Sequence, residues 1–245
     1  MEPAGLLDPE VFPSPKRVRV TLGGRVIADS RRAVLLRPGR GPPSYYFPLN
    51  DLAPGVLAES ERREAVPAAG QARFFHVRAG GRERRDAAWT VDEPAGPVAA
   101  LSGHVAFRWG AMDAWYEEDE EVFVHPRDPR VRVDTARSSL PVRATVDGET
   151  VAESRRPTLL FETGLPTRYY LPGLDIRQDL LEPSGTVSYC PYKGEARYYS
   201  VRIGGWLVKD AAWCYRYPRP EACDIAGLLC FYPEKVALEL EAPAG

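Results

Sequence analysis

Hydrophobic and polar residues alternate along most of this 245-residue chain, which is the period of β-strands. Residues 18–22 read Val-Arg-Val-Thr-Leu, and a Gly-Gly pair separates them from a second polar and apolar run at 25–29. The same pattern recurs at 74–78 and 82–89 around another Gly-Gly pair. Paired runs of this kind, joined by residues that tolerate positive φ, predict β-hairpins. The chain is therefore predicted to be all-β.

The pattern occurs twice in the chain. Adding 124 to a residue number in the first copy gives the corresponding residue in the second copy. Tyr45-Tyr46-Phe47-Pro48 becomes Tyr169-Tyr170-Leu171-Pro172, and Asp86-Ala87-Ala88-Trp89 becomes Asp210-Ala211-Ala212-Trp213. The register holds without a gap from residue 18 to residue 107. Self-similarity at a fixed offset indicates a tandem duplication of one domain.

The predicted boundaries follow from this duplication. We expect a flexible tail at 1–15, a first repeat domain at 16–126, a linker at 127–139 and a second repeat domain at 140–245. One or two short helices are expected in each copy. One is predicted at 175–181 with Asp175 as its cap, and another turn or helix at 221–226.

Charge and composition narrow the classes of partner. Lys and Arg number 32 against 34 Asp and Glu, so nucleic acid is an unlikely partner, and no apolar run is long enough to span a membrane. No signal-peptide pattern opens the chain, and we expect a soluble, cytoplasmic protein with its four cysteines as free thiols. The acidic run at 117–121 is interpreted as a solvated loop or strand end without chemistry.

No metal or other cofactor is expected. The cysteines lack a Cys-x-x-Cys pair, and none of the four has a cysteine counterpart in the first copy. His76, His104 and His125 are single and scattered, which is typical of satisfied polar residues more than of ligands or bases.

The segment Cys190-Pro191-Tyr192-Lys193-Gly194 carries the most evident chemistry. Its counterpart is Val66-Pro67-Ala68-Ala69-Gly70, so proline and glycine persist while the thiol, phenol and amine occur only in the second copy. What both copies keep is explained most simply by the fold. Cys190, Tyr192 and Lys193 are thus the candidates for function.

Several roles are open to this segment. A cation near Cys190 would lower the pKa of the thiol and make it a nucleophile, and Lys193 would supply that cation. Lys193 would alternatively form a Schiff base or orient an anionic ligand. The competing interpretation is an inert, buried thiol beside a solvated lysine.

Further candidates surround this segment in the second copy. Tyrosine and tryptophan shared by both copies are structural in the first interpretation, and in the second they line a cage for a flat or cationic ligand. Arg155 is a candidate clamp for a carboxylate or phosphate, and Asp210 either satisfies turn amides or contacts ligand. The candidate ligand-binding set is Tyr169, Tyr170, Tyr192, Tyr199, Trp213, Arg155 and Asp210, with Cys190 and Lys193 as candidate catalytic residues.

Taken together, these motifs resemble the domain of unknown function 427 family. The resemblance rests on Tyr-Tyr-x-Pro, Cys-Pro-Tyr-Lys-Gly, Arg-Tyr-Tyr-Ser-Val-Arg, Gly-Gly, Asp-Ala-Ala-Trp and the closing segment from Ile225-Ala226-Gly227 to Phe231-Tyr232. It implies a β-tent-like fold, twice, and no activity. The family has also been filed under a nucleotidyltransferase heading, but the chain has no Gly-Ser segment followed by paired aspartates.

Three functions remain open from the sequence. The first is a small-molecule site in the second repeat, with Cys190 and Lys193 as the residues of a possible enzyme. The second is a non-catalytic module that binds a metabolite or modified group in an aromatic cage. The third is a purely structural or interaction protein. Nucleotidyl transfer, as in the family's filing, is kept as a weakly supported alternative, and the sequence leaves ligand and oligomeric state undefined.

Overall fold

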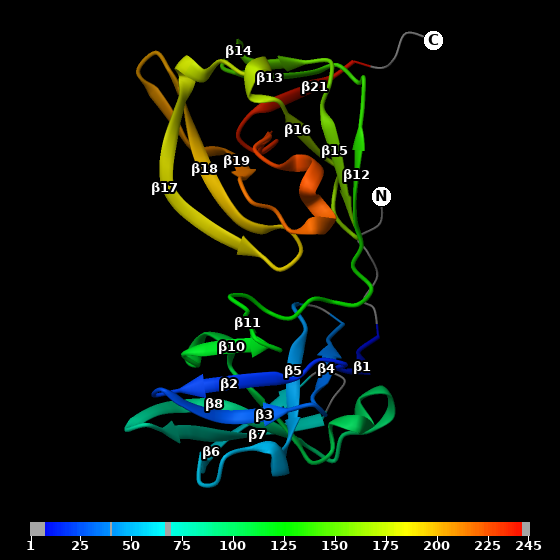
Figure 1. Cartoon of the computed structure of the whole chain (residues 1–245), viewed down its shortest axis with the longest axis vertical. Helices are drawn as coiled ribbons and strands as arrows, with labels where there is room; N and C mark the ends of the chain where they lie inside the picture. Colours follow the sequence, from blue (N-terminus) through cyan, green and yellow to red (C-terminus); the bar gives the residue numbers. More distant parts are fainter. Residues whose placement is uncertain (1–7, 40, 67–69, 242–245) are drawn as a thin grey trace. The chain divides into compact units, whose positions relative to one another are not determined.

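The computed structural model describes residues 8–39, 41–66 and 70–241, and the chain divides into two units, residues 1–128 and 129–245 (Figure 1). Each unit is built almost entirely from antiparallel strands, which confirms the all-β prediction and the duplication. The described part of each unit contains one seven-stranded sheet and one smaller sheet.

In the first unit the large sheet has the order β1-β4-β5-β9-β8-β7-β6 and the small sheet the order β11-β10-β2-β3. The strands are β1 Glu10–Pro13, β2 Val18–Leu22, β3 Arg25–Ser30, β4 Val34–Arg37, β5 Ser44–Pro48, β6 Leu57–Val66, β7 Gly70–Ala79, β8 Arg82–Asp92, β9 His104–Phe107, β10 Ala114–Glu117 and β11 Glu120–Glu121. Short 3-10 turns are η1 Leu49–Asp51, η2 Gly96–Leu101 and η3 Trp109–Ala111.

The second unit repeats this order as β12-β15-β16-β20-β19-β18-β17, with a small sheet β14-β13-β21. The strands are β12 Val133–Arg137, β13 Val142–Val146, β14 Glu149–Ser154, β15 Thr158–Glu162, β16 Arg168–Leu171, β17 Leu181–Cys190, β18 Gly194–Ile203, β19 Trp206–Tyr215, β20 Leu229–Phe231 and β21 Ala237–Leu240. The 3-10 turns are η4 Gly173–Asp175, η5 Gln178–Leu180 and η6 Pro220–Ile225.

Strand alternation builds the main core of each unit. Val18, Val20 and Leu22 of β2 are fully buried between the two sheets, and Val142 and Ala144 of β13 repeat this placement. Each fully buried valine or leucine contributes about 1.5–3 kcal/mol relative to an exposed one. The alternation of apolar and polar residues in the sequence thus matches the alternation of core-facing and outward-facing side chains along these strands.

The opposite face of the second large sheet carries a second cluster. Along β19, Ala212 and Cys214 point into the main core, while Trp213 and Tyr215 point to the other face. There they pack with Ile225 of η6, which covers part of that face. Because both faces are covered, neighbouring residues of one strand belong to different environments.

Two strands lie in segments expected to be irregular. β1 falls within the expected tail at 1–15 and pairs with β4, and β12 falls within the expected linker at 127–139 and pairs with β15. Each is the outer strand of its large sheet. Both are short edge strands, and their few apolar residues give too little alternation to distinguish them from loops.

The predicted helix at 175–181 is wrong in detail. The segment forms the 3-10 turns η4 and η5, separated by an extended Ile176 that bridges to Ala152. Asp175 does not cap a helix. Its carboxylate accepts hydrogen bonds from Ser154 Oγ at 2.7 Å and from Arg156 at 2.7 Å. Ser30, Asp51 and Arg32 make the same cluster in the first unit, so it belongs to the fold.

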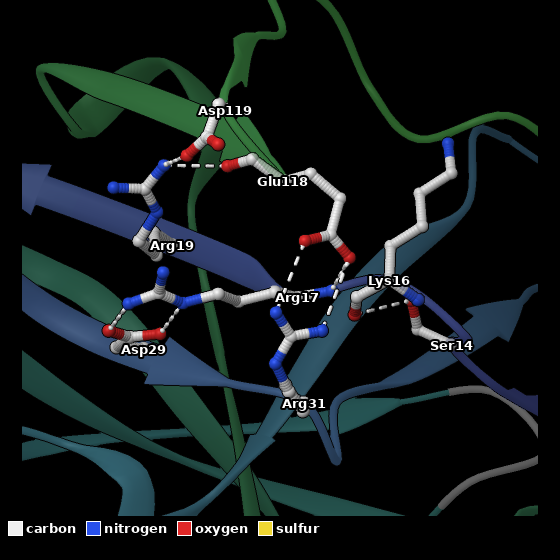
Figure 2. Close-up of polar contacts among 8 residues, drawn as sticks. All are labelled: Ser14, Lys16, Arg17, Arg19, Asp29, Arg31, Glu118 and Asp119. Carbon is white, nitrogen blue, oxygen red and sulfur yellow. Dashed lines mark hydrogen bonds and ion pairs between the residues drawn. The ribbon is translucent and has the colours of Figure 1, made fainter.

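The acidic run at 117–121 ends β10 and turns into β11 (Figure 2). Glu118 accepts a hydrogen bond from the Arg17 backbone N–H at 2.8 Å and pairs with Arg31, while Asp119 pairs with Arg19 at 3.0 Å. Arg17 in turn makes a two-point contact with Asp29. Most of the basic residues of this hairpin are thereby neutralised within the unit.

The serine of the Ser154, Asp175 and Arg156 cluster should stabilise the second unit. Ser154→Ala is expected to lower the free energy of unfolding by about 1–3 kcal/mol, because it removes the hydrogen bond from Ser154 to the half-buried Asp175 carboxylate. Urea denaturation at neutral pH measures this change. Ser139→Ala, at an exposed serine, is the matched control and should change little; equal losses in both variants would contradict the role of the cluster.

The same cluster predicts a pH dependence. The hydrogen bond from Arg156 lowers the pKa of Asp175, so its contribution to stability is present above the pKa of the unfolded chain, about 4, and is lost as pH falls through the lower folded pKa. The stability gap between the natural chain and Asp175→Asn should therefore shrink below about pH 4. A gap that stays constant from pH 7 to the acid limit would overturn this assignment.

Candidate functional site

Cys190 and Gly194 face each other at the closed end of the β17–β18 hairpin, and Pro191, Tyr192 and Lys193 form its loop. Gly194 has φ +98°, and a Cβ at this position would lie 3.3 Å from the Tyr217 carbonyl oxygen. Gly70 of the first unit has φ +110° and the same pairing position. The conserved glycine therefore serves the hairpin and not the chemistry.

Lys193 is the buried charge of this loop. Its side chain is 11% exposed, and its ammonium forms an ion pair with the Glu162 carboxylate, which is 10% exposed. The Lys193 carbonyl accepts a hydrogen bond from the Arg219 N–H, so the loop is also fixed from the side of η6. A pair withdrawn from water in this way is stable only while both partners are present.

A pocket of about 160 Å³ opens beside this pair. Half of its lining residues are aromatic: Trp213 and Tyr232 have ring centroids 4.3 Å apart, and Tyr198 stacks on Tyr232 at 6.4 Å. The Arg168 guanidinium lies over the Trp213 ring at 5.5 Å. The lining residues are Glu162, Leu165, Pro166, Arg168, Tyr170, Lys193, Tyr198, Trp213, Tyr215 and Tyr232.

Three tyrosines of the pocket have a raised pKa, which keeps their phenols neutral at pH 7. Burial is the main cause that raises the pKa of Tyr170, Tyr215 and Tyr232 above the ordinary value for tyrosine. The charges at the pocket therefore come from Lys193, Arg168 and Glu162, which leave a formal excess of one positive charge.

The structure brings together three of the residues predicted from the sequence. Lys193, Tyr170 and Trp213 all line the pocket, and the Trp213 indole N–H donates a hydrogen bond to the Tyr170 hydroxyl at 3.2 Å. Trp89 and Tyr46 make the same bond at 3.0 Å in the first unit. Because both units make this hydrogen bond, it belongs to the common fold. In the second unit the two residues that make it also form part of the pocket wall.

Tyr169 and Tyr199 are placed elsewhere. Tyr169 precedes Tyr170 on β16 and Tyr199 follows Tyr198 on β18, so the alternation of a strand sends both to the opposite face of the sheet. There they pack against the main core. The expected walls of the cage are therefore split between two faces, with Tyr170 and Trp213 on one and Tyr169 and Tyr199 on the other.

Cys190 is half-buried and packs against the cluster that contains Trp213 and Tyr215. In the described part of the chain it is not among the residues that line the pocket, and the Lys193 ammonium bonds to Glu162. The nucleophilic role of Cys190 stays a prediction.

The remaining candidates occupy other positions. Tyr192 is half-buried in the hairpin loop, and Arg155 is exposed after β14 while its neighbour Arg156 contacts Asp175. Asp210 has φ +50° at a bulge of β19, where Thr186 Oγ1 donates to its carboxylate at 2.9 Å. Asp86 repeats this backbone conformation, which favours a structural role for both aspartates.

Sequence reasoning missed seven residues of the pocket, namely Leu165, Pro166 and five charged or aromatic residues. Glu162, Arg168, Tyr198, Tyr215 and Tyr232 correspond to Pro38, Ser44, Phe74, Val91 and Arg108 in the first copy. The comparison between copies that singled out Lys193 contains the signal for all five. They were missed because they lie on five different segments, β15, β16, β18, β19 and the loop after β20, and only the fold brings them together.

Among the residues that the structure describes, no group of three or more His, Cys, Asp or Glu side chains is placed to hold a metal ion. The Nδ1 atom of His76 accepts a hydrogen bond from the Asp86 backbone N–H at 3.0 Å, so it supports the bulge of β8.

The paired sheets, repeated with the same strand order, define a tandem protein of two homologous β domains. The chain belongs to the domain of unknown function (DUF427) family, whose model matches residues 10–118 and again residues 134–242. A comparison with curated proteins finds no match. No helix in the described residues is long and apolar enough to cross a membrane.

The buried pair makes a prediction about stability. Lys193→Met and Glu162→Gln should each lower the free energy of unfolding by about 3–5 kcal/mol, because each leaves a charge or polar group buried without its partner. The double variant Lys193→Met with Glu162→Leu should recover much of this loss, as measured by chemical denaturation.

Lys209→Met, at an exposed lysine of β19, is the control for the loss of one positive charge. The assignment is contradicted when Lys193→Met lowers the free energy of unfolding no more than Lys209→Met does. It is also contradicted when the loss in the double variant equals the sum of the losses in the two single variants.

Proposed function

We propose that the second domain binds a small planar anion in the pocket beside Lys193. The observation that carries this proposal is the concentration of cations and aromatic rings in one of two otherwise equivalent domains. The first copy has proline, serine and valine where the second has Glu162, Arg168 and Tyr215. Drift of single surface residues would not collect these changes around one cavity.

The size of the pocket limits the ligand. A cavity of about 150 Å³ holds a benzene-sized molecule, and sites for drug-sized ligands begin at about 300 Å³. A pocket of about 160 Å³ is thus suited to one six-membered ring with a small substituent. A nucleoside triphosphate does not fit this volume.

The charges favour an anionic substituent. Arg168 is half-buried over Trp213 and presents a guanidinium to the pocket, which suits a carboxylate with two oxygens. A cationic ligand would compete with Arg168 for the same ring face and meet the excess positive charge. The aromatic cage is therefore better suited to an anion than to the cation considered from the sequence.

Benzoate is a suitable probe, and benzamide is its neutral counterpart. We expect benzoate to bind at least about tenfold more tightly than benzamide, a difference of about 1.4 kcal/mol that a charge-assisted hydrogen bond supplies. Arg168→Ser, which introduces the residue of the first copy, should remove this preference. Calorimetry or ligand-observed NMR measures both affinities.

Arg62→Ser is the matched control, because Arg62 lies over the Phe74 ring at 4.4 Å in the first domain. It should leave benzoate binding unchanged. Equal binding of benzoate and benzamide, or an equal effect of the two arginine variants, would refute the proposal.

Catalysis by Cys190 is the second candidate function, since this thiol packs on the same cluster as the pocket wall. Binding without catalysis predicts that Cys190→Ala keeps benzoate affinity within about twofold and that iodoacetamide modifies the exposed Cys223 before Cys190. Burial raises the pKa of Cys230 to about 12, so this thiol serves as the unreactive reference. Faster modification of Cys190 than of Cys223 would instead favour the enzyme.

A further inference from the structure

A second hollow lies on the same domain, at the end of the large sheet where β17, β18 and the residues after β19 meet. Its volume is about 610 Å³, within the range of sites for ligands larger than one ring. The residues that line it are Pro183, Ser184, Glu195, Arg197, Tyr198, Tyr199, Arg216 and Tyr217. Only Tyr199 of this groove was a candidate from the sequence.

Arginine and tyrosine side chains give the groove its chemistry. Arg216 donates a hydrogen bond to the Tyr199 hydroxyl at 3.4 Å, and among the described residues no carboxylate forms an ion pair with it. Arg197 pairs through Nε with Glu195 at 2.5 Å, which leaves its terminal nitrogens for another acceptor. Two guanidiniums and one carboxylate line the groove, which gives it a net positive charge suited to an anion.

The first domain shows that this charge is not required by the fold. At the positions of Arg216 and Tyr217 it has Asp92 and Glu93. Asp92 pairs with Arg73, the counterpart of Arg197, at 3.4 Å. The four equivalent positions 71, 73, 92 and 93 carry a formal charge of −1, whereas 195, 197, 216 and 217 carry +1. Where the first domain has an aspartate that neutralises Arg73, the second domain has a second arginine, Arg216.

An exposed aromatic ring completes the groove. The Tyr217 side chain is 91% exposed, so its ring faces are open to a ligand. A phenol at the edge of a basic groove offers a stacking surface for a flat ring whose charged group reaches the guanidiniums. A phosphate monoester on an aromatic ring combines both features.

We propose that this groove binds an aromatic phosphate monoester, with Arg216 and Arg197 on the phosphate and Tyr217 against the ring. Tyr198 lines both sites, but Arg197, Arg216 and Tyr217, on which this proposal rests, do not line the pocket beside Lys193.

Phenyl phosphate is the probe. Inorganic phosphate, which has no ring, shows how much the ring contributes to binding. Arg216→Asp restores the residue of the first copy and is expected to fold, since Asp92 occupies this position beside Arg73. It should weaken phenyl phosphate binding by about a hundredfold, and Arg216→Gln by about tenfold. Tyr217→Ala should weaken binding of phenyl phosphate by about fivefold or more and leave inorganic phosphate unchanged.

Arg202→Gln is the matched control, because Arg202 is an exposed arginine of β18 that pairs with Glu182, and neither residue lines the groove. It should have no effect in a two-dimensional NMR titration. Absence of phenyl phosphate binding, an equal effect of Arg202→Gln and Arg216→Gln, or a loss caused by Arg168→Ser instead would overturn the proposal. The benzoate test depends on Arg168 and not on Arg216, so failure of one site is distinguishable from failure of the other.

Discussion

The constraint on which both domains depend is that the large sheet is covered on both faces. A strand sends alternate residues to opposite sides, so each strand must satisfy the main core and a second environment at once. β19 shows this directly: Ala212 and Cys214 pack with the small sheet, and Trp213 and Tyr215 pack on the other face. Residues on the second face can therefore be replaced only where the packing of the first face stays intact.

The duplication shows which changes this constraint permits. The first domain fills the second face with an apolar cluster that includes Leu36, Val91 and Leu101. The second domain keeps the bonded tyrosine and tryptophan of that cluster but adds Tyr215, Lys193 and Glu162 around them. The scaffold contacts persist in both copies, so polar groups were introduced on a surface whose geometry was already fixed.

Much of the fold could be predicted from the sequence, because alternation and Gly-Gly turns are local signals. The edge strands β1 and β12 could not, since they are short and their pairing with β4 and β15 is a long-range contact. Of the site, Lys193, Tyr170 and Trp213 were predicted, and Glu162 was not. Its partner is 31 residues away, and only the pairing of β15 within the sheet brings the two charges together.

The buried ion pair links the pocket to the stability of the domain. Two charges withdrawn from water cost more free energy than an apolar pair of similar size would, and the first domain reaches the same fold without them. Glu162 pairs with Lys193 and restrains the amine against the pocket wall, while Arg168 lies over Trp213. The fold does not require this pair, and the pair fixes a cation beside an aromatic cavity, which is what the proposed anion site needs.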